Sequence, residues 1–582
     1  MPVIENSIPA VLIARAQERP DEVAYTFWDY EVDPNGFAED LTYGQLYNRA
    51  KVVADELLAN GAVGDRAAIL APQSLDYVVA FWGALLAGFI AVPLPVPMFG
   101  VLDERVAAAL RDCSPSVILT TSAAIDEVAQ YAQADRGPAP TVIEVDLLDL
   151  DAPREIEPLR GSYPNVAYLQ YTSGSTRSPA GCEITHENVI GNFIDLVPDY
   201  YRDSGEIAPD DVTIVSWLPF YHDMGLLVGV IWPIWLPRKS VLMSPVAFLQ
   251  RPARWMQLLG TNTNVFTAAP NFAFELAIRK TTDDDLAGCD LVNIRTMLNG
   301  AERVNAGTIR RFYERFARNG FQEASHRPSY GLAEGTIYVM TSRAGETPIV
   351  AWFDYDQLSS GQAVRTEGGE GSTELVGYHL SGRPLVKIVD PETRVECPEG
   401  KVGEMWVHGP NTSRAYWRNP ELTERCLAGR LVDPAPGVPE GPWLQTGDLG
   451  VVSEGDLFII GRLKDLLIVD GRNHYPDDIE ATIQKIAAGR CAAISVADDQ
   501  TERLVAIIEL KSRGGADQSA ARLDSVKRDI TTAILNSHQL RVADLVLVGP
   551  GSIPITSSGK TRRSACAELY RLDKFERLDN SA

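Results

Sequence analysis

The chain has 582 residues, of which 45% are hydrophobic and 23% are charged, and its formal net charge is −25. A chain of this length and composition can bury large hydrophobic cores and is typical of a globular protein with several domains. The acidic excess argues against a broad nucleic-acid or membrane surface, because both of these partners require basic patches. The seven cysteines are scattered and never spaced C-x-x-C. This indicates neither a disulfide framework nor a zinc site, and it favours a cytoplasmic location, as does an N-terminus without signal-peptide features.

Helical and strand-like stretches alternate in the first half of the chain. The segments RAAIL (66–70), VILTT (117–121) and VIEVD (142–146) are strand-like, and helical patterns lie between them. This alternation predicts an α/β architecture with mostly parallel sheets. After about residue 372 the pattern shortens into strands joined by turns, which predicts a β-rich subdomain. RTEGGEGSTE (365–374) is the most linker-like stretch.

The run from Tyr77 to Leu102 contains no charged residue. Its length would permit a membrane span, but Gly88 and three prolines interrupt it. We therefore favour a buried helix that ends near Gly88, followed by a short strand at 91–94, and we expect no transmembrane segment.

GRLKD (461–465) marks a domain boundary in the sequence. A unit of about 120 residues follows, which is within the normal size range of a domain. It contains the strand-like stretches AAISV (492–496) and LVAIIEL (504–510). It also contains an amphipathic helix whose apolar stripe is formed by Leu523, Val526, Ile530 and Ile534.

The stretch YTSGSTRSPAG (171–181) is rich in glycine and hydroxylated residues. A strand-like segment precedes it and a helical one, HENVIGNFIDLV, follows it. A strand–loop–helix of this composition offers N–H groups and hydroxyls to phosphate oxygens. The stretch does not match the Walker pattern and its one cation is Arg177. An ordinary polar turn is the alternative.

Three further stretches combine glycine with polar or aromatic residues. WLPFYHDMGLL (217–227) places His222 within an apolar run, either as a core residue or at the mouth of an apolar pocket. NGAE (299–302) and PSYGLAEG (328–335) are solvent-facing turns or parts of a site. In a site, Tyr330 could stack on a base and Glu334 could bind Mg²⁺, which prefers oxygen ligands.

Two stretches near the domain boundary and the C-terminus carry charged residues. In TGDLG (446–450), Asp448 follows a strand-like segment and could bind a ribose diol, and Arg462 lies in GRLKD. PITSSGKTRR (554–563) places Lys560 after a glycine, where a flexible lysine suits developing negative charge. Surface turns and a solvated basic tail are the alternatives.

Taken together, these motifs occur in the order and spacing of one family. The chain resembles the adenylate-forming enzymes, which include acyl-CoA synthetases, luciferases and the adenylation domains of peptide synthetases. The loop at 171–181 departs from the common family pattern, because Arg177 and Ala180 replace a glycine and a lysine. This version, together with a segment at about 349–372 that looks like an insertion, resembles the fatty acyl-AMP ligases of mycobacterial lipid synthesis.

The resemblance implies a large N-terminal domain (1–461) with parallel and mixed sheets and a β-rich subdomain, a hinge (462–465) and a small, mobile α+β C-terminal domain (466–582). It implies activation of a medium- or long-chain fatty acid by ATP and Mg²⁺. In that family Lys560 would be catalytic, with His222 near the carboxylate, Glu334 at the metal and Lys464 as the hinge residue. The phosphate-binding residues would be Thr172, Ser173, Gly174, Ser175 and Thr176; the adenine-binding residues would be Gly300, Ala301, Glu302, Ser329, Tyr330, Gly331 and Leu332; and the ribose-binding residues would be Asp448 and Arg462.

The resemblance also implies a partner, because the acyl-AMP would pass to an acyl carrier protein or a polyketide synthase. The basic stretch that follows Lys560 is a candidate docking edge. An acyl-CoA synthetase is the nearest alternative, and Arg177, Ala180 and the insertion argue against it. An amino-acid adenylating enzyme lacks support, because WLPFYHDMG has no FDxS-like aspartate. A catalytically dead binding protein would lack Lys560, Glu334 or Asp448, and all three are present.

Overall fold

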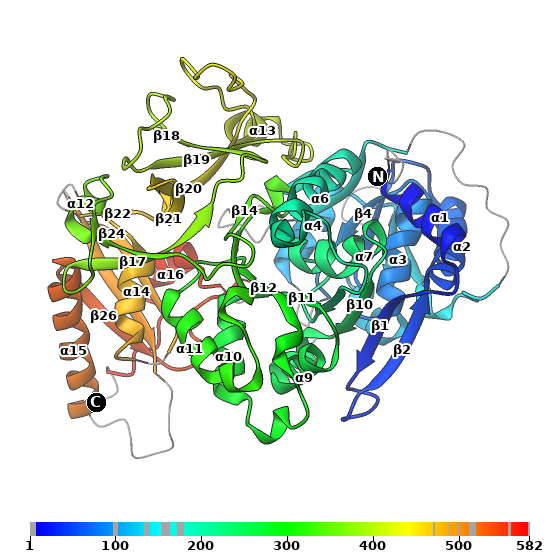
Figure 1. Ribbon diagram of the computed structural model, residues 1–582, viewed down its shortest axis with the longest axis horizontal. Coiled ribbons are helices and arrows are strands. Elements are labelled where there is room, and N and C mark those ends of the chain that lie inside the picture. Colours follow the sequence, from blue (N-terminus) through cyan, green and yellow to red (C-terminus); the bar gives the residue numbers. More distant parts are fainter. Residues whose placement is uncertain are drawn as a thin grey trace.

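A computed structural model gives the fold. It describes residues 7–96, 103–132, 139–152, 163–171, 180–469, 472–487, 489–498, 501–510, 520–556 and 560–579. Three large blocks follow one another along the molecule in Figure 1: a blue-to-cyan N-terminal part, a green central part and an orange-to-red C-terminal part.

The first sheet has six strands in the order β6-β5-β3-β4-β7-β8. Five of them pair in parallel, and the last pair, β7 and β8, is antiparallel. The strands are β3 (Arg66–Ile69), β4 (Ile90–Pro93), β5 (Val117–Thr120), β6 (Thr141–Glu144), β7 (Val166–Tyr171) and β8 (Gly181–Thr185). The predicted strands at 66–70, 117–121 and 142–146 are thereby confirmed.

The uncharged run is a buried helix followed by a strand, as predicted. Helix α3 (Leu75–Leu86) has every residue from Tyr77 onward buried and packs against α2 (Tyr43–Asn60). The chain turns at Gly88, whose φ of +71° suits a residue without a side chain. None of the helices in the described ranges is both long and apolar enough to cross a membrane.

The second sheet is continuous from a parallel half to an antiparallel half. Its main path is β18-β19-β20-β21-β17-β14-β13-β12-β11-β9-β10-β1-β2. The parallel half contains β1 (Val23–Asp29), β9 (Thr213–Ser216), β10 (Lys239–Met243), β11 (Val265–Pro270), β12 (Ile294–Gly300) and β13 (His326–Tyr330), with β2 (Phe37–Thr42) at the edge. The antiparallel half contains β14 (Met340–Thr341), β17 (Ser372–His379), β18 (Leu385–Val389), β19 (Gly403–His408), β20 (Leu444–Ser453) and β21 (Asp456–Arg462). The β-rich region is therefore an extension of the parallel sheet.

The segment expected as an insertion is ordered structure at one side of this sheet. Strand β15 (Val350–Asp354) pairs with β17 and β16 (Arg365–Thr366), and helix α12 (Tyr355–Ser359) lies between β15 and β16. The prediction of a linker at 365–374 is wrong. Its glycines form the turn between β16 and β17, where Gly368, Gly369 and Gly371 have positive φ, so their abundance reflects turn geometry.

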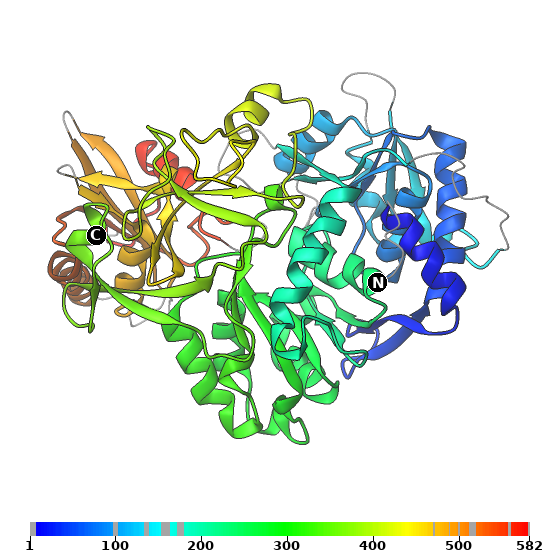
Figure 2. The same cartoon turned by 45° about the horizontal axis from the view of Figure 1, so that its top comes forward.

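The C-terminal elements form an α+β unit, as the fold class predicted. A short hairpin of β22 (Leu467–Val469) and β23 (Arg472–His474) precedes a three-stranded sheet. That sheet contains β24 (Cys491–Asp498), β25 (Thr501–Glu509) and β26 (Val542–Val548), and its helices are α14 (Pro476–Gln484), α15 (Ala520–His538) and α16 (Arg563–Arg571). The unit lies beside α11 (Ala306–Phe316), α12 and β17 in both ribbon views (Figures 1 and 2).

The C-terminal unit is held together internally by a charge cluster on Arg563. Its guanidinium contacts Asp465 at 3.1 Å and Glu480 at 2.7 Å, and it also pairs with Asp477. Burial lowers the pKa of Arg563, but Asp477 and Glu480 raise it by more, so that its pKa lies above the ordinary value. Helix α16, which begins three residues after Lys560, is thus tied to α14.

We expect Arg563→Ala to lower the free energy of unfolding by about 3 kcal/mol, because it leaves two largely buried carboxylates without their cation. Urea unfolding followed by tryptophan fluorescence measures the change. Arg571→Ala, an exposed position on the same helix, is the matched control and should stay within about 0.5 kcal/mol of the parent. Equal stability of the two variants would contradict the role of the cluster.

Candidate functional site

A cleft of about 2770 Å³ lies where the parallel strands of the second sheet end and the C-terminal unit begins. The ends of β11, β12 and β13 open into it, as do β20, the loop after β9 and the Lys560 segment. Ligands of open α/β sheets bind at the carboxyl ends of the strands. Of the predicted residues within the described ranges, those that line the cleft are His222, Ala301, Glu302, Ser329, Tyr330, Gly331, Leu332, Glu334, Asp448, Arg462, Lys464 and Lys560.

Tyr330, Asp448 and Arg462 form one hydrogen-bonded chain. The Tyr330 hydroxyl donates to Asp448 Oδ2 at 2.6 Å, and Arg462 Nε lies 2.9 Å from Asp448 Oδ1. Asp448 and Arg462 are direct partners on β20 and β21, so strand pairing places the acid beside its cation. Burial and the Asp448 charge raise the pKa of Tyr330, which keeps its hydroxyl protonated as a donor. These contacts fix the Tyr330 ring and the Asp448 carboxylate beside each other in the cleft.

The loop after β12 places Glu302 in the lining of the cleft. Its carboxylate accepts a hydrogen bond from the Phe272 backbone N–H at 2.7 Å, and burial raises its pKa. Gly300 must be glycine, because a Cβ there would lie 2.7 Å from the Ser329 carbonyl oxygen. The Ser329 hydroxyl lies 2.7 Å from the hydroxyl of Tyr200, the last residue of helix α6 (His186–Tyr200). Ser329 can therefore contribute backbone, but not its hydroxyl, to the cleft.

His222 and Asp223 lie on a tightly supported loop between β9 and the π-helix Gly225–Ile231. The side chain of Gln170 donates to the Tyr221 carbonyl at 2.9 Å, and Asp223 accepts from the Met224 N–H at 2.8 Å. Burial raises the pKa of Asp223, and the Lys560 charge opposes that rise. The interpretation of His222 as a pocket residue rather than a core residue fits its place in the cleft lining.

Lys560 faces carboxylates from three separate elements. Burial and the charge of Arg462 lower its pKa, while Glu302, Asp223 and Asp448 oppose that change. Two hydrogen bonds join Lys560 to Thr556. The Lys560 N–H donates to the Thr556 hydroxyl at 3.0 Å, and the Thr556 N–H donates to the Lys560 carbonyl at 2.8 Å. Desolvation and Arg462 likewise lower the pKa of Lys464, which also lines the cleft.

Glu334 supplies a further carboxylate to the cleft lining. Its Oε1 accepts a hydrogen bond from the Tyr416 hydroxyl at 2.6 Å, and its carbonyl accepts from the Ser413 N–H at 2.7 Å. Across the described part of the chain, no group of three or more His, Cys, Asp or Glu residues is arranged to hold a metal. A single carboxylate nevertheless fits Mg²⁺, which typically takes one or two carboxylates together with substrate phosphates.

The predicted phosphate-binding residues Thr172, Ser173, Gly174, Ser175 and Thr176 lie outside the described residues, as does Arg177. The flanking structure corrects one expectation. The loop joins the antiparallel strands β7 and β8, and α6 (His186–Tyr200) begins only after β8. Strand β8 therefore stands between this stretch and α6, where the sequence indicated a direct passage into a helix.

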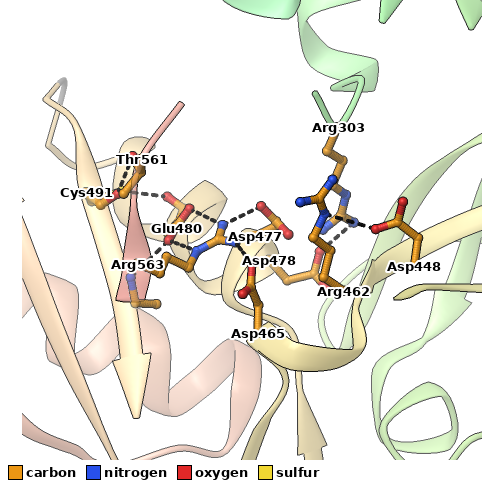
Figure 3. Close-up of polar contacts among 11 residues, drawn as sticks. Arg303, Asp448, Arg462, Asp465, Asp477, Asp478, Glu480, Cys491, Thr561 and Arg563 are labelled. Carbon is orange, nitrogen blue, oxygen red and sulfur yellow. Dashed lines mark hydrogen bonds and ion pairs between the residues drawn. The ribbon is translucent and has the colours of Figure 1, made fainter. Parts of the chain in front are cut away.

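One ion pair that no motif indicated connects the two sides of the cleft (Figure 3). Arg303, which follows Glu302, lies 2.7 Å from Asp478 on α14. The Arg563 cluster lies beside it on the C-terminal side. Burial lowers the pKa of Arg303, but the charges of Asp478 and Asp477 raise it by more, so that its pKa lies above the ordinary value. Sequence offered no signal for this pair, because its members belong to different units of the fold.

Comparisons with known proteins agree with this geometry. The AMP-binding enzyme family model matches residues 12–417, and the model described as Disco-interacting protein 2-like, AMP domain, matches residues 464–579. The long-chain-fatty-acid–AMP ligase FadD26 of Mycobacterium marinum is 58% identical over the full length of both chains. A 4-hydroxyphenylalkanoate adenylyltransferase of Mycobacterium bovis is 56% identical over 99% of this chain and 94% of its own. A fatty acyl-adenylate ligase of L. pneumophila, solved with acyl adenylate and pyrophosphate, has a TM-score of 0.72 and 30% identity over 99% of each chain.

We expect Arg462→Gln to raise the pKa values of both Lys560 and Lys464, because Arg462 is a positive neighbour that lowers each of them. NMR titration of ¹³C-methylated lysines, assigned with Lys560→Arg and Lys464→Arg, measures the two values. Arg571→Gln is the control for loss of a distant charge. Unchanged or lower pKa values in Arg462→Gln would contradict the electrostatic description of the cleft.

Proposed function

Because the chain belongs to the AMP-binding enzyme family and, within it, to the long-chain-fatty-acid–AMP ligases, we propose that it converts a medium- or long-chain fatty acid and ATP to acyl-adenylate and pyrophosphate. The observation that carries this proposal is the meeting of Lys560 with Glu302, Asp223 and Asp448 in one cleft. A cation placed among carboxylates in one cleft can stabilise a substrate carboxylate and phosphate when these are bound.

The reaction forms one bond and breaks one. A fatty carboxylate oxygen attacks the α-phosphorus of ATP, and the bond from that phosphorus to the bridging oxygen of pyrophosphate breaks. The negative charge that accumulates makes positioning and electrostatics the main sources of catalysis. The Lys560 ammonium would contact both the attacking carboxylate and the α-phosphate, and His222 would orient the carboxylate. Mg²⁺ would be held by Glu334 and would neutralise phosphate charge.

The nucleoside would lie against the Tyr330–Asp448–Arg462 chain. The Tyr330 ring offers a face for adenine, and the Ala301, Glu302, Gly331 and Leu332 segments line the same region. Asp448, fixed by Tyr330 and Arg462, would accept hydrogen bonds from the ribose diol, because a carboxylate can take both hydroxyls. Gly300 would allow the close approach of β13 on which this arrangement depends, and Thr172, Ser173, Gly174, Ser175 and Thr176 would hold the phosphates.

The segment at about 349–372 would restrain the C-terminal domain (466–582) relative to the N-terminal domain (1–461). The Tyr355 hydroxyl lies 3.0 Å from His474 Nδ1, and Gln539 Nε2 donates to Asp356 Oδ2 at 3.0 Å. Tyr475 is buried in the same cluster as Phe353 and Leu358. Rotation about the proposed hinge residue Lys464, within 462–465, must break these contacts and the Arg303–Asp478 pair. Coenzyme A would therefore not be used, and acyl-adenylate would be the released or transferred product.

An acyl carrier protein or polyketide synthase would receive the acyl group in the cytoplasm. Two cations of the candidate docking edge, the basic stretch after Lys560, are paired within the C-terminal unit. Arg563 is occupied by the internal cluster, and Arg577 pairs with Asp544 at 2.6 Å. The cations of this stretch that remain exposed, such as Arg571 and Lys574, are fewer than the sequence implies. A carrier surface would need additional residues from elsewhere in the molecule.

The experiment is incubation with ATP, Mg²⁺ and a C12–C18 fatty-acid series, with and without coenzyme A, followed by mass spectrometry of the products. We expect acyl-AMP in both conditions and a loss of activity of about a hundredfold or more in Lys560→Ala, because the transition-state charge loses its cation. Acyl-CoA as the main product would show an acyl-CoA synthetase instead.

The same assay tests the restraint. Tyr355→Phe combined with Asp356→Ala removes the polar contacts with His474 and Gln539 and should allow measurable acyl-CoA, while acyl-AMP formation persists. Asp354→Ala, which removes only the N-cap of α12, is the control on the same segment. If the double variant forms normal acyl-AMP and no acyl-CoA, these contacts do not exclude coenzyme A.

A further inference from the structure

Helix α6 carries a buried stripe of polar side chains behind the cleft. Asn188, Asn192, Asp195 and Asp199 recur at helical spacing and are all buried. None of them reaches the cleft lining. We propose that Asn192, together with Asn411 on the loop after β19, is a positioning residue that sets the orientation of Glu334. This inference rests on the proposed function, because it assigns a means of control to the carboxylate that would hold Mg²⁺.

The two asparagines clamp the turn that follows Glu334. Asn192 Nδ2 donates to the carbonyls of Gly335 at 3.3 Å and Tyr338 at 3.0 Å. Asn411 Nδ2 donates to the same two carbonyls at 3.3 Å and 2.8 Å. Both asparagines are fully buried. Two side chains from distant parts of the chain thus converge on one pair of backbone acceptors.

The clamped turn has a backbone conformation that needs external support. Thr336 has a φ of +66°, which is unfavourable for a β-branched residue. Its hydroxyl donates to the Asn411 carbonyl at 2.6 Å, so the clamp also engages the strained residue directly. Strained backbone persists where surrounding contacts over-determine it and tends to occur at functional sites. The turn begins one residue after Glu334, so its geometry determines the position of the Glu334 Cα atom and the direction of its Cα–Cβ bond.

The other end of the Glu334 side chain is held by the same loop that supplies Asn411. Asn188 donates to the carbonyls of Pro410 at 2.8 Å and Thr412 at 2.9 Å, which ties this loop to α6. From the loop, the Ser413 N–H reaches the Glu334 carbonyl, and Tyr416 reaches the Glu334 carboxylate. Helix α6 therefore supports Glu334 along two routes, one through the turn and one through the loop.

The asparagines are used as donors alone. The Oδ1 atoms of both Asn192 and Asn411 are buried and have no hydrogen-bond partner in the structure. A buried acceptor without a partner is unfavourable, and an apolar residue would avoid that cost. The hydrogen bonds that the amide N–H groups donate to the turn after Glu334 therefore explain why an asparagine occupies both positions.

The test is a double-mutant cycle with Glu334→Gln, read by calorimetric titration with ATP at saturating Mg²⁺ and with ATP in EDTA. We expect Asn192→Ala to weaken binding of Mg²⁺–ATP by about tenfold or more, as is usual for loss of a group that orients a metal ligand. Binding of ATP without Mg²⁺ should be unchanged. In the Glu334→Gln background, Asn192→Ala should add no further loss, because it acts through Glu334.

Asn411→Ala provides a second variant with the same expected pattern if Asn192→Ala does not fold. Asn262→Ala, which removes an asparagine donor to the Leu258 carbonyl on α9 (Ala253–Thr261), is the control and should leave both affinities unchanged. Equal weakening with and without Mg²⁺, or losses that add to that of Glu334→Gln, would overturn the proposal. If Glu334→Gln itself leaves Mg²⁺ dependence intact while acyl-AMP still forms, the clamp has no metal ligand to position and is overturned, but the proposed reaction stands.

Discussion

The ion pair between Arg303 and Asp478 determines how the two sides of the cleft meet. Arg303 directly follows Glu302 at the end of β12, and Asp478 lies on the first long helix of the C-terminal unit. Ion pairs of this kind contribute little net stability, because desolvation offsets the attraction, but separating one of the charges from its partner is costly. The pair therefore specifies orientation. With α14 held against the end of β12, the Arg563 cluster and the Lys560 segment are placed opposite Asp223, Glu302 and Asp448.

The rest of the site is a set of side chains fixed before any substrate arrives. Strand pairing sets Asp448 beside Arg462, a hydrogen bond adds Tyr330, and the α6 stripe supports Glu334 from behind. Such preorganisation matters because the proposed reaction gains its rate from positioned charges, which need no rearrangement as the transition state forms. Because these groups are fixed, release of the C-terminal unit would require a discrete rotation. That rotation would break the Arg303–Asp478 pair and the contacts of Tyr355 and Asp356.

The sequence predicted the elements well where the pattern was local. The buried helix before Gly88 and the stripe of Leu523, Ile530 and Ile534 were both readable from periodicity. Strand β8 was missed because five residues containing Glu183 give a weak strand signal. The helix predicted at HENVIGNFIDLV does begin at His186, where Thr185 and Asn188 form a capping box. Contacts such as Arg303–Asp478 and the double clamp by Asn192 and Asn411 join residues distant in sequence, so only the tertiary arrangement reveals them. The roles predicted for the motif residues rest on the resemblance to the adenylate-forming enzymes.

The proposed reaction requires the C-terminal unit to be held in the orientation that presents Lys560 to the cleft. The most direct measurement is the distance distribution between spin labels at Ile207 and Leu572, two exposed positions on opposite sides of the cleft, attached through an encoded keto amino acid. We expect a single distance that persists when ATP, Mg²⁺, fatty acid and coenzyme A are added, and a second population in Asp478→Ala. Two populations in the parent protein, or a shift caused by coenzyme A, would contradict it.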